Sequence, residues 1–292
     1  MGLDINGTKF LLFAKRLGVS FGETAMIGRQ EMLVSSGVLK ANLKAFGYAL
    51  SDAESGELLA DKFAEPFLKT LGAREIVSFD ASDYENASVT HDFNLPIPSE
   101  YKGKFSAVLD GGTLEHIFNF PTAIKNCMEM VREGGHYLSI TPANNHLGHG
   151  FYQFSPELFF RIFSSQNGFE LERLMIFEET LNSPWYEVVD PDAVNERVTL
   201  VNSAHTMLLV VARKIKTMEI FDPMPQQSDY VSAWTGDHNS GSAPSPRFSR
   251  LPFRELLVLP LTAVRKLRLA AARSFGMLTR QNKHFKKVEL PE

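Results

Sequence analysis

Cysteine is nearly absent from this sequence, which contains a single one, Cys127, in 292 residues. One thiol excludes an intrachain disulfide framework, and its place on the apolar face of an expected helix indicates a core residue rather than a nucleophile. No apolar run reaches the roughly 18 residues that a transmembrane helix needs. The first residues also lack a basic region followed by an apolar core and a small-residue cleavage site. We therefore expect a cytoplasmic protein.

The composition is that of a globular chain with an unevenly distributed charge. Hydrophobic residues make up 44% of the sequence, which is ample for the core of an α/β domain of about 200 residues with an additional segment. The net charge is −4, yet eleven Lys and Arg stand against three acids from Arg247 onward. The C-terminal part is therefore a separate electrostatic unit.

Residues 105–144 follow the pattern of a strand, an acidic turn, a helix, a Gly-Gly turn and a second strand. The first strand ends at Asp110-Gly111, and the helix is expected to stop at Gly134-Gly135 before the apolar run from Tyr137 to Ile140. A buried parallel strand delivers a polar residue at its carboxyl end to a ligand crevice. The segment is therefore a βαβ unit, and Asp110 and Gly111 are candidate ligand-binding residues.

This unit resembles the second half of a class I S-adenosylmethionine-dependent methyltransferase. The matching residues are Asp110, Leu114-Glu115-His116 and Gly134-Gly135, and the resemblance extends over residues 75–178. It implies an α/β fold with a Rossmann-like, seven-stranded, mostly parallel sheet and flanking helices, with S-adenosylmethionine as the cofactor. It also implies that His116 lies beside the cofactor and Glu115 contacts the acceptor. The alternative for His116 is a solvent-facing residue at the start of a helix.

The loop after the first expected strand departs from that family. The strand is Thr24 to Ile27, and Gly28 is the one residue present of the family's Gly-rich loop. The family needs those glycines because the backbone passes close to the methionine portion of the cofactor. Arg29 and Gln30 are candidates to contact the cofactor carboxylate with their side chains instead.

Two acids follow the second and third expected strands. Glu75 to Phe79 leads to Asp80, whose carboxylate can accept hydrogen bonds from both hydroxyls of a ribose. The third strand is Ala87 to Phe93, and the resemblance implies that Asp92 and Phe93 contact the adenine. Ordinary turn and core roles are the alternatives for these residues.

The spacing of these elements predicts an insertion. Gly28 and Asp80 are much farther apart than the roughly 20 residues typical of this kind of fold. Residues 31–55 are therefore expected to be an inserted helical segment that covers the ligand pocket. The apolar runs from Phe169 to Phe177 and from Ser203 to Ala212 complete the seven strands.

The segment 141–156, TPANNHLGHGFYQFSP, is the candidate acceptor site. It follows the fifth expected strand, where an open parallel sheet presents its loops to the ligand. Its polar side chains Asn144, Asn145, Tyr152 and Gln153 are predicted to bind the acceptor together with Glu115.

The two histidines of this segment are candidate catalytic bases. An imidazole titrates near neutral pH and suits removal of a proton from an acceptor hydroxyl. His149, flanked by glycines, is the first choice and His146 the second, and structural hydrogen bonding is the alternative. With His116 or Asp110 they could also form a set of nitrogen and oxygen metal ligands. No further ligand spacing supports that set, so no metal is predicted.

The chain is expected to divide after the last strand. Residues 1–214 would form the methyltransferase-like domain, and residues 215–250, which are rich in Pro, Gly and Ser, would form a linker. Residues 251–292 would form a basic amphipathic C-terminal extension.

That extension has apolar residues on one helical face between Leu261 and Leu278. Such a helix can pack on its own domain or on a second copy of the chain, forming a homo-oligomer. It can also lie on the inner face of an anionic membrane, through residues 253–287. Nucleic acid is not an expected partner, because aromatic residues are not interleaved with the basic ones.

The predicted function is transfer of a methyl group from S-adenosylmethionine to an oxygen or nitrogen of a small-molecule or glycan acceptor. The segment 148–159 resembles bacterial methyltransferases of surface polysaccharide or secondary-metabolite pathways, and this resemblance implies a glycan acceptor, with surface polysaccharide biosynthesis as the expected pathway class. One alternative is a non-catalytic, methyltransferase-like interaction module. Another is a nucleotide-dependent reductase, against which the absence of a GxGxxG motif counts.

Overall fold

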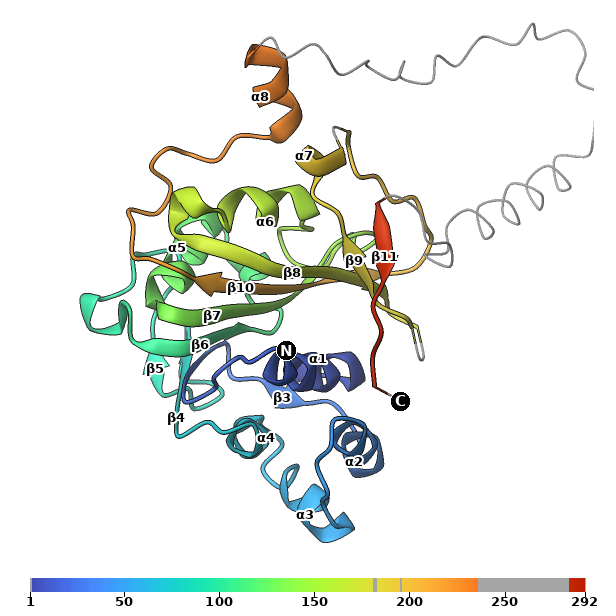
Figure 1. Ribbon diagram of the computed structural model, residues 1–292. Helices are drawn as coiled ribbons and strands as arrows, with labels where there is room; N and C mark the ends of the chain where they lie inside the picture. Colours follow the sequence, from blue (N-terminus) through green and yellow to red (C-terminus); the bar gives the residue numbers. More distant parts are fainter. Residues whose placement is uncertain (1, 181–182, 195, 236–283, 292) are drawn as a thin grey trace, which may run out of the picture.

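The computed structural model describes residues 2–180, 183–194, 196–235 and 284–291. A mixed sheet forms the centre of this part of the chain (Figure 1). Its strands are β2 (Glu23–Ile27), β4 (Glu75–Asp80), β5 (Val89–Thr90), β6 (Phe105–Asp110), β7 (Val131–Pro142), β8 (Phe169–Glu178), β9 (Tyr186–Val188), β10 (Thr206–Lys214) and β11 (Phe285–Lys287). A separate two-stranded sheet joins β1 (Gly2–Leu3) to β3 (Glu31–Met32).

The strand order of the large sheet is β11-β9-β8-β10-β7-β6-β2-β4-β5. Strands β5, β4, β2, β6 and β7 are parallel, and the direction of winding reverses between β2 and β6. This reversal is the switch point of a doubly wound fold, where such sheets bind ligands. The last two of the seven expected strands are β8 and β10, which pair antiparallel, and β10 inserts between β8 and β7. The described sheet exceeds the predicted seven strands because β9 and β11 extend it beyond β8.

Helices cover both faces of this sheet (Figure 1). The helices are α1 (Ile5–Arg16), α2 (Ser36–Ala45), α3 (Asp52–Glu57), α4 (Glu65–Thr70), α5 (Phe120–Met130), α6 (Pro156–Ile162), α7 (Pro191–Val194) and α8 (Ser228–Thr235), with short 3₁₀ turns η1 (Ser99–Tyr101), η2 (Leu114–His116) and η3 (Ser165–Asn167). One apolar layer contains α5, α6 and side chains such as Val108, and the other contains α1, α2, α4 and side chains such as Leu109. Successive strand residues thus enter opposite layers, as buried parallel strands require. Cys127 is fully buried in the first layer, as predicted.

The Gly134-Gly135 pair does not end a helix, contrary to the expectation. Helix α5 already ends at Met130, and both glycines lie within β7. Gly134 has a φ of +75°, and a Cβ on Gly135 would lie 2.9 Å from the backbone oxygen of Phe105. The register between β6 and β7 shifts next to this contact. The glycines therefore allow an irregularity where two strands approach closely.

The predicted insertion, residues 31–55, contains β3, α2 and the first part of α3, and α2 packs against α1. The Asn42 side-chain amide donates hydrogen bonds to the backbone oxygen of Ile5 at 3.0 Å and to Oγ1 of Thr8 at 2.9 Å. The inserted residues therefore belong to the helical layer on that face of the sheet.

The predicted C-terminal extension lies mostly outside the described residues. Of the stretch 253–287 expected to contact a membrane, the structure describes the part from His284 onward, and this part forms β11 rather than a helix. Strand β11 pairs antiparallel with β9, with Phe285 opposite Val188. None of the described helices combines the length and hydropathy that a membrane crossing requires.

Candidate functional site

The carboxyl ends of four parallel strands meet at one edge of the sheet. Ile27 of β2 pairs with Phe79 of β4 on one side and with Asp110 of β6 on the other, and Asp110 pairs with Ser139 of β7. Gly28 and Asp80 therefore follow neighbouring strands at the switch point, next to the turn that begins after Asp110. The sheet brings these sequence-predicted positions together.

Asp110 is buried, and both oxygens of its carboxylate accept hydrogen bonds from other groups of the protein. One carboxylate oxygen accepts hydrogen bonds from the backbone N–H groups of Thr113 at 2.8 Å and Leu114 at 3.3 Å. The other accepts from the hydroxyls of Ser139 at 3.0 Å and Tyr137 at 3.2 Å. Burial raises the pKa of the Asp110 carboxyl above its usual value. The residue thus fixes the turn that leads into η2, and both of its carboxylate oxygens accept hydrogen bonds from within the protein.

Glu115, in contrast, is buried without a hydrogen bond of standard geometry, and its one ion-pair contact among the described residues is with His149. Its side chain is 1% exposed, and neither carboxylate oxygen has a hydrogen-bond partner among the described residues. Burial, with a smaller contribution from the nearby Asp110 charge, raises the pKa of Glu115 to about 8, against smaller lowering effects of its own backbone N–H and the Thr141 hydroxyl. Gly112, at φ +93°, lies against this carboxylate, since a Cβ there would be 3.2 Å from Oε1. An orphaned buried carboxyl is costly for a fold and is therefore a functional candidate.

Two histidines lie beside Glu115. The Nε2 atom of His149 is 3.7 Å from Oε1 of Glu115, and the rings of His116 and His149 are 5.1 Å apart. The coordinating atoms of the three side chains lie within 4.8 Å of one another. Burial, followed by the neighbouring His149, lowers the pKa of His116. The backbone oxygen of Glu115 accepts from the N–H of Phe151 at 2.7 Å, which fastens the loop that carries His149.

A second group of similar composition lies next to the first. His146 is buried, and its Nε2 is 3.8 Å from Oε2 of Glu179, which is in turn 3.4 Å from Nδ1 of His205. The rings of His146 and His149 are 5.7 Å apart. Burial is the main cause that lowers the pKa of His146. Sequence reasoning missed Glu179 and His205, which meet because they flank the paired ends of β8 and β10.

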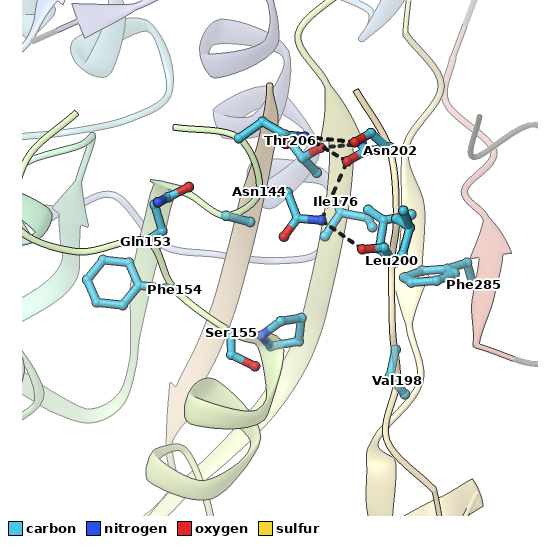
Figure 2. A pocket seen from close by; sticks show the side chains of 14 residues that line it. Asn144, Gln153, Phe154, Ser155, Ile176, Val198, Leu200, Asn202, Thr206 and Phe285 are labelled. Carbon is cyan, nitrogen blue, oxygen red and sulfur yellow. Dashed lines mark hydrogen bonds between the residues drawn. The ribbon is translucent and has the colours of Figure 1, made fainter. Parts of the chain in front are cut away.

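The predicted acceptor residues Asn144, Asn145 and Gln153 line a cavity of about 540 Å³ (Figure 2). The Asn144 amide donates to the backbone oxygen of Leu200 at 3.0 Å, and the Asn145 amide donates to Oδ1 of Asn202 at 2.8 Å. Figure 2 shows Gln153 and Phe154 on one side of the cavity and Leu200 and Phe285 on the other. The cavity thus combines amide groups with apolar walls, as small-molecule sites commonly do.

Tyr152 does not belong to this lining. Its hydroxyl donates to the backbone oxygen of Phe118 at 2.6 Å, and its ring stacks with that of Phe154 at 5.9 Å. These contacts hold the Tyr152 side chain against Phe118 and Phe154, and its contact with an acceptor stays a prediction.

The side chains of the loop after β2, Arg29 and Gln30, contact other groups of the protein. Arg29 donates to Glu65 at 2.7 Å and lies 3.8 Å from the centroid of the Phe63 ring. Gln30 is fully buried, and its amide donates to the backbone oxygens of Ile27 at 3.1 Å and Gly28 at 3.2 Å. Its Oε1 has no hydrogen-bond partner among the described residues. Arg29 and Gln30 therefore contact the protein where a cofactor carboxylate was expected.

The three remaining candidates differ in their availability to a ligand. Asp80 is partly exposed, and within the described part of the chain its carboxylate makes no hydrogen bond or ion pair. Asp92 accepts from the backbone N–H of Asn94 at 2.9 Å and from its side-chain amide at 2.8 Å, which lowers the pKa of Asp92. Phe93 is buried in the core, edge-on to Phe79 at 6.1 Å. Of the three, Asp80 has the free carboxylate among the described residues, Asp92 is hydrogen-bonded within its own turn and Phe93 packs in the core; their contacts with a cofactor stay predictions.

Comparison with known proteins adds structural neighbours at low similarity. No family model matches the sequence, and no curated protein matches it. A putative methyltransferase from Bacillus halodurans C-125 is 15% identical, with a TM-score of 0.36, and covers 70% of this chain and 99% of its own. The N-methyltransferase NodS from Bradyrhizobium japonicum WM9, in complex with S-adenosyl-l-homocysteine, is 12% identical, with a TM-score of 0.39, and covers 72% of this chain and 87% of its own.

The branched-chain polyamine synthase from Thermus thermophilus is also similar, at 12% identity and a TM-score of 0.38. The match covers 73% of this chain but 57% of the synthase, so this chain spans little more than half of that neighbour. The fold itself follows from the strand order, with its parallel half, its switch point between β2 and β6 and its helices on both faces. The chain therefore has the α/β, Rossmann-like fold that the resemblance to class I methyltransferases implies.

Proposed function

We propose that this chain is an S-adenosylmethionine-dependent methyltransferase that acts on an oxygen or nitrogen of a small-molecule or glycan acceptor. The observation that carries the proposal is that Asp80 and the cavity after β7 both lie at the carboxyl edge of the sheet. Asp80 presents an unpaired, partly exposed carboxylate beside the switch point, and the cavity lined by Asn144 and Gln153 follows β7 on the same edge. The first suits the ribose of a nucleoside cofactor, and the second suits an acceptor.

The lining of the cavity supports a polar acceptor. Neutral amides hydrogen-bond hydroxyl and amine groups, and the apolar wall formed by Ile176 and Leu200 suits the face of a sugar ring or a small heterocycle. A glycan acceptor from surface polysaccharide biosynthesis is the specific form that we propose.

His149 is the proposed base. Methyl transfer from a sulfonium requires alignment of the acceptor with the methyl group, and an acceptor hydroxyl must also lose its proton. The His149 side chain is 53% exposed, whereas that of His146 is 8% exposed. His149 is therefore the more accessible to an acceptor of the two histidines.

Calorimetry with S-adenosylmethionine and S-adenosylhomocysteine tests the proposal. We expect the full-length protein to bind both ligands and the Asp80→Ala variant to lose most of that affinity. Asp83→Ala is the matched control, because Asp83 is an exposed aspartate in the turn that follows β4. If the unaltered protein binds neither ligand, the proposal is wrong.

The filled loop after β2 favours a second candidate, a non-catalytic methyltransferase-like module. The Arg29–Glu65 ion pair and the buried Gln30 occupy the place where the family presents glycines to its cofactor. On this hypothesis the acceptor cavity binds a ligand without chemistry, and Asp80→Ala changes nothing that the calorimeter measures.

A further inference from the structure

We propose that Glu115, His116 and His149 form a binding site for one divalent transition-metal ion, such as Zn²⁺. The three coordinating atoms already lie within 4.8 Å of one another at the carboxyl edge of the sheet. This inference goes beyond the proposed function and is measured without S-adenosylmethionine, and it replaces the base role proposed for His149 with metal coordination.

The spacing of the ligand atoms is close to what a metal requires. In a tetrahedral site with bonds near 2.1 Å, neighbouring ligand atoms lie roughly 3.4 Å apart. The separation between His149 Nε2 and Glu115 Oε1 is 3.7 Å. Both histidines are exposed, so rotations of their side chains can close the remaining gap without disturbing the core.

The buried carboxylate is the second, independent observation. Glu115 is 1% exposed, and neither of its oxygens has a hydrogen-bond partner among the described residues. Buried charged groups in proteins are paired or coordinate metals, because burial of an isolated charge is costly. A bound cation would supply a partner of permanent positive charge, whereas His149 is charged only when it is protonated.

The ligand set indicates the class of metal. Two imidazoles and one carboxylate are typical of catalytic zinc and of non-haem iron, and they leave coordination positions open. Gly148 and Gly150, at φ +89° and +73°, let the loop present His149 beside Glu115. The spacing of His146 and His149 predicts no metal by itself, and it is the fold that adds the buried Glu115 to the histidines.

The neighbouring group of His146, Glu179 and His205 is the competing location. It has the same composition, but the side chain of Glu179 is 38% exposed and already lies 3.4 Å from His205. Its carboxylate is therefore solvated, and it lacks the strong requirement for a cation that Glu115 has.

Metal coordination and proton transfer at His149 exclude one another at the same nitrogen. A nitrogen bound to a metal has no lone pair left to accept a proton. If the ion is bound through Nε2, it can instead act as a Lewis acid toward an acceptor oxygen.

The test is a titration of chelator-treated full-length protein with Co²⁺, followed by displacement with Zn²⁺. We expect one Co²⁺ per chain with a visible absorption band of a low-symmetry nitrogen and oxygen site, and loss of the band when Zn²⁺ is added. Glu115→Gln and His149→Gln should each weaken Zn²⁺ binding by at least about 100-fold, more than loss of an outer-shell group usually does. His91→Gln, outside both groups, is the control and should leave the affinity within about twofold.

Three outcomes would overturn the proposal. The first is the absence of stoichiometric Co²⁺ or Zn²⁺ binding to the unaltered protein. The second is binding that persists in His149→Gln, whose exposed side chain can be replaced without loss of the fold even if Glu115→Gln does not fold. The third is binding that His205→Gln abolishes and His149→Gln preserves, because it assigns the ion to the neighbouring group.

Discussion

The indole Nε1 of Trp185 donates a hydrogen bond to Oδ1 of Asn6, with 3.2 Å between the two atoms. The partners are 179 positions apart in the chain, and both are buried. The ring of Phe13 lies edge-on to the same indole, with centroids 6.0 Å apart. One side chain thus fastens the N-terminal helix α1 to the segment that enters β9.

Loss of the Asn6 amide should destabilise the protein. The Asn6→Ala variant leaves the buried indole N–H without an acceptor, which costs about 1–3 kcal/mol in the free energy of unfolding. Urea unfolding followed by fluorescence measures this change. In a Trp185→Phe background, followed by circular dichroism, Asn6→Ala should cost less, because no indole donor remains. An equal cost in both backgrounds would contradict the role of this hydrogen bond.

Gly111 and Gln30 are predicted to be coupled. A Cβ on Gly111 would lie 2.3 Å from Oε1 of Gln30, so Gly111→Ala should lower the stability by about 1–3 kcal/mol. Gln30→Ala removes the obstructing atoms, and the double variant should therefore be more stable than the sum of the single effects predicts. Thermal unfolding of the four proteins in the cycle measures the coupling, and strict additivity would refute it.

The two acids at the switch point are predicted to differ sharply in their effect on stability. Asp110→Ala strips four hydrogen-bond donors of their acceptor inside the core, so we expect a loss of more than about 3 kcal/mol. Asp80→Ala should change the stability by no more than about 0.5 kcal/mol, because Asp80 is partly exposed and has no partner among the described residues. Denaturant titrations compare the two, and similar losses would contradict the assignment of a structural role to Asp110 alone.

His136 is predicted to make the stability depend on pH. Burial is the main cause that lowers its pKa below the usual 6.5, against an opposing effect of Glu172. As the pH falls below about 6.5, His136 takes up a proton in the unfolded chain before it does so in the folded protein. Protonation therefore favours the unfolded chain, and the free energy of unfolding decreases as the pH falls. Chemical unfolding between about pH 5 and 8 measures the slope. His136→Gln should flatten it, and an unchanged slope would show that other groups dominate.

The sequence predicted those strands whose apolar runs are local, and β6, on one side of the switch point, is among them. β4, β6, β8 and β10 all coincide with such runs. The sequence did not predict helix α1, because its residues from Phe10 to Ala14 are all apolar and buried. Such a run has no polar face and therefore shows no helical period. The N-cap of α1 was a usable signal, since Asp4 accepts from the backbone N–H of Gly7 at 2.7 Å.

The candidate site was predictable in its location and less so in its chemistry. The acceptor residues Asn144, Asn145 and Gln153 lie together because they belong to one loop. The grouping of His146 with Glu179 and His205 arises from strand pairing between distant segments, which no local pattern encodes. The isolation of Glu115 from hydrogen-bond donors is likewise a property of the packed interior, and the sequence shows only its position after a turn.

The pairing of β11 with β9 has a consequence for how the protein is made. Strand β9 leaves the ribosome long before β11, so its outer edge lacks a backbone partner while the nascent chain grows. Phe285, which lines the acceptor cavity, arrives with β11. During translation the parallel half of the sheet can therefore form early, whereas the wall of the cavity is completed only once β11 has been synthesised.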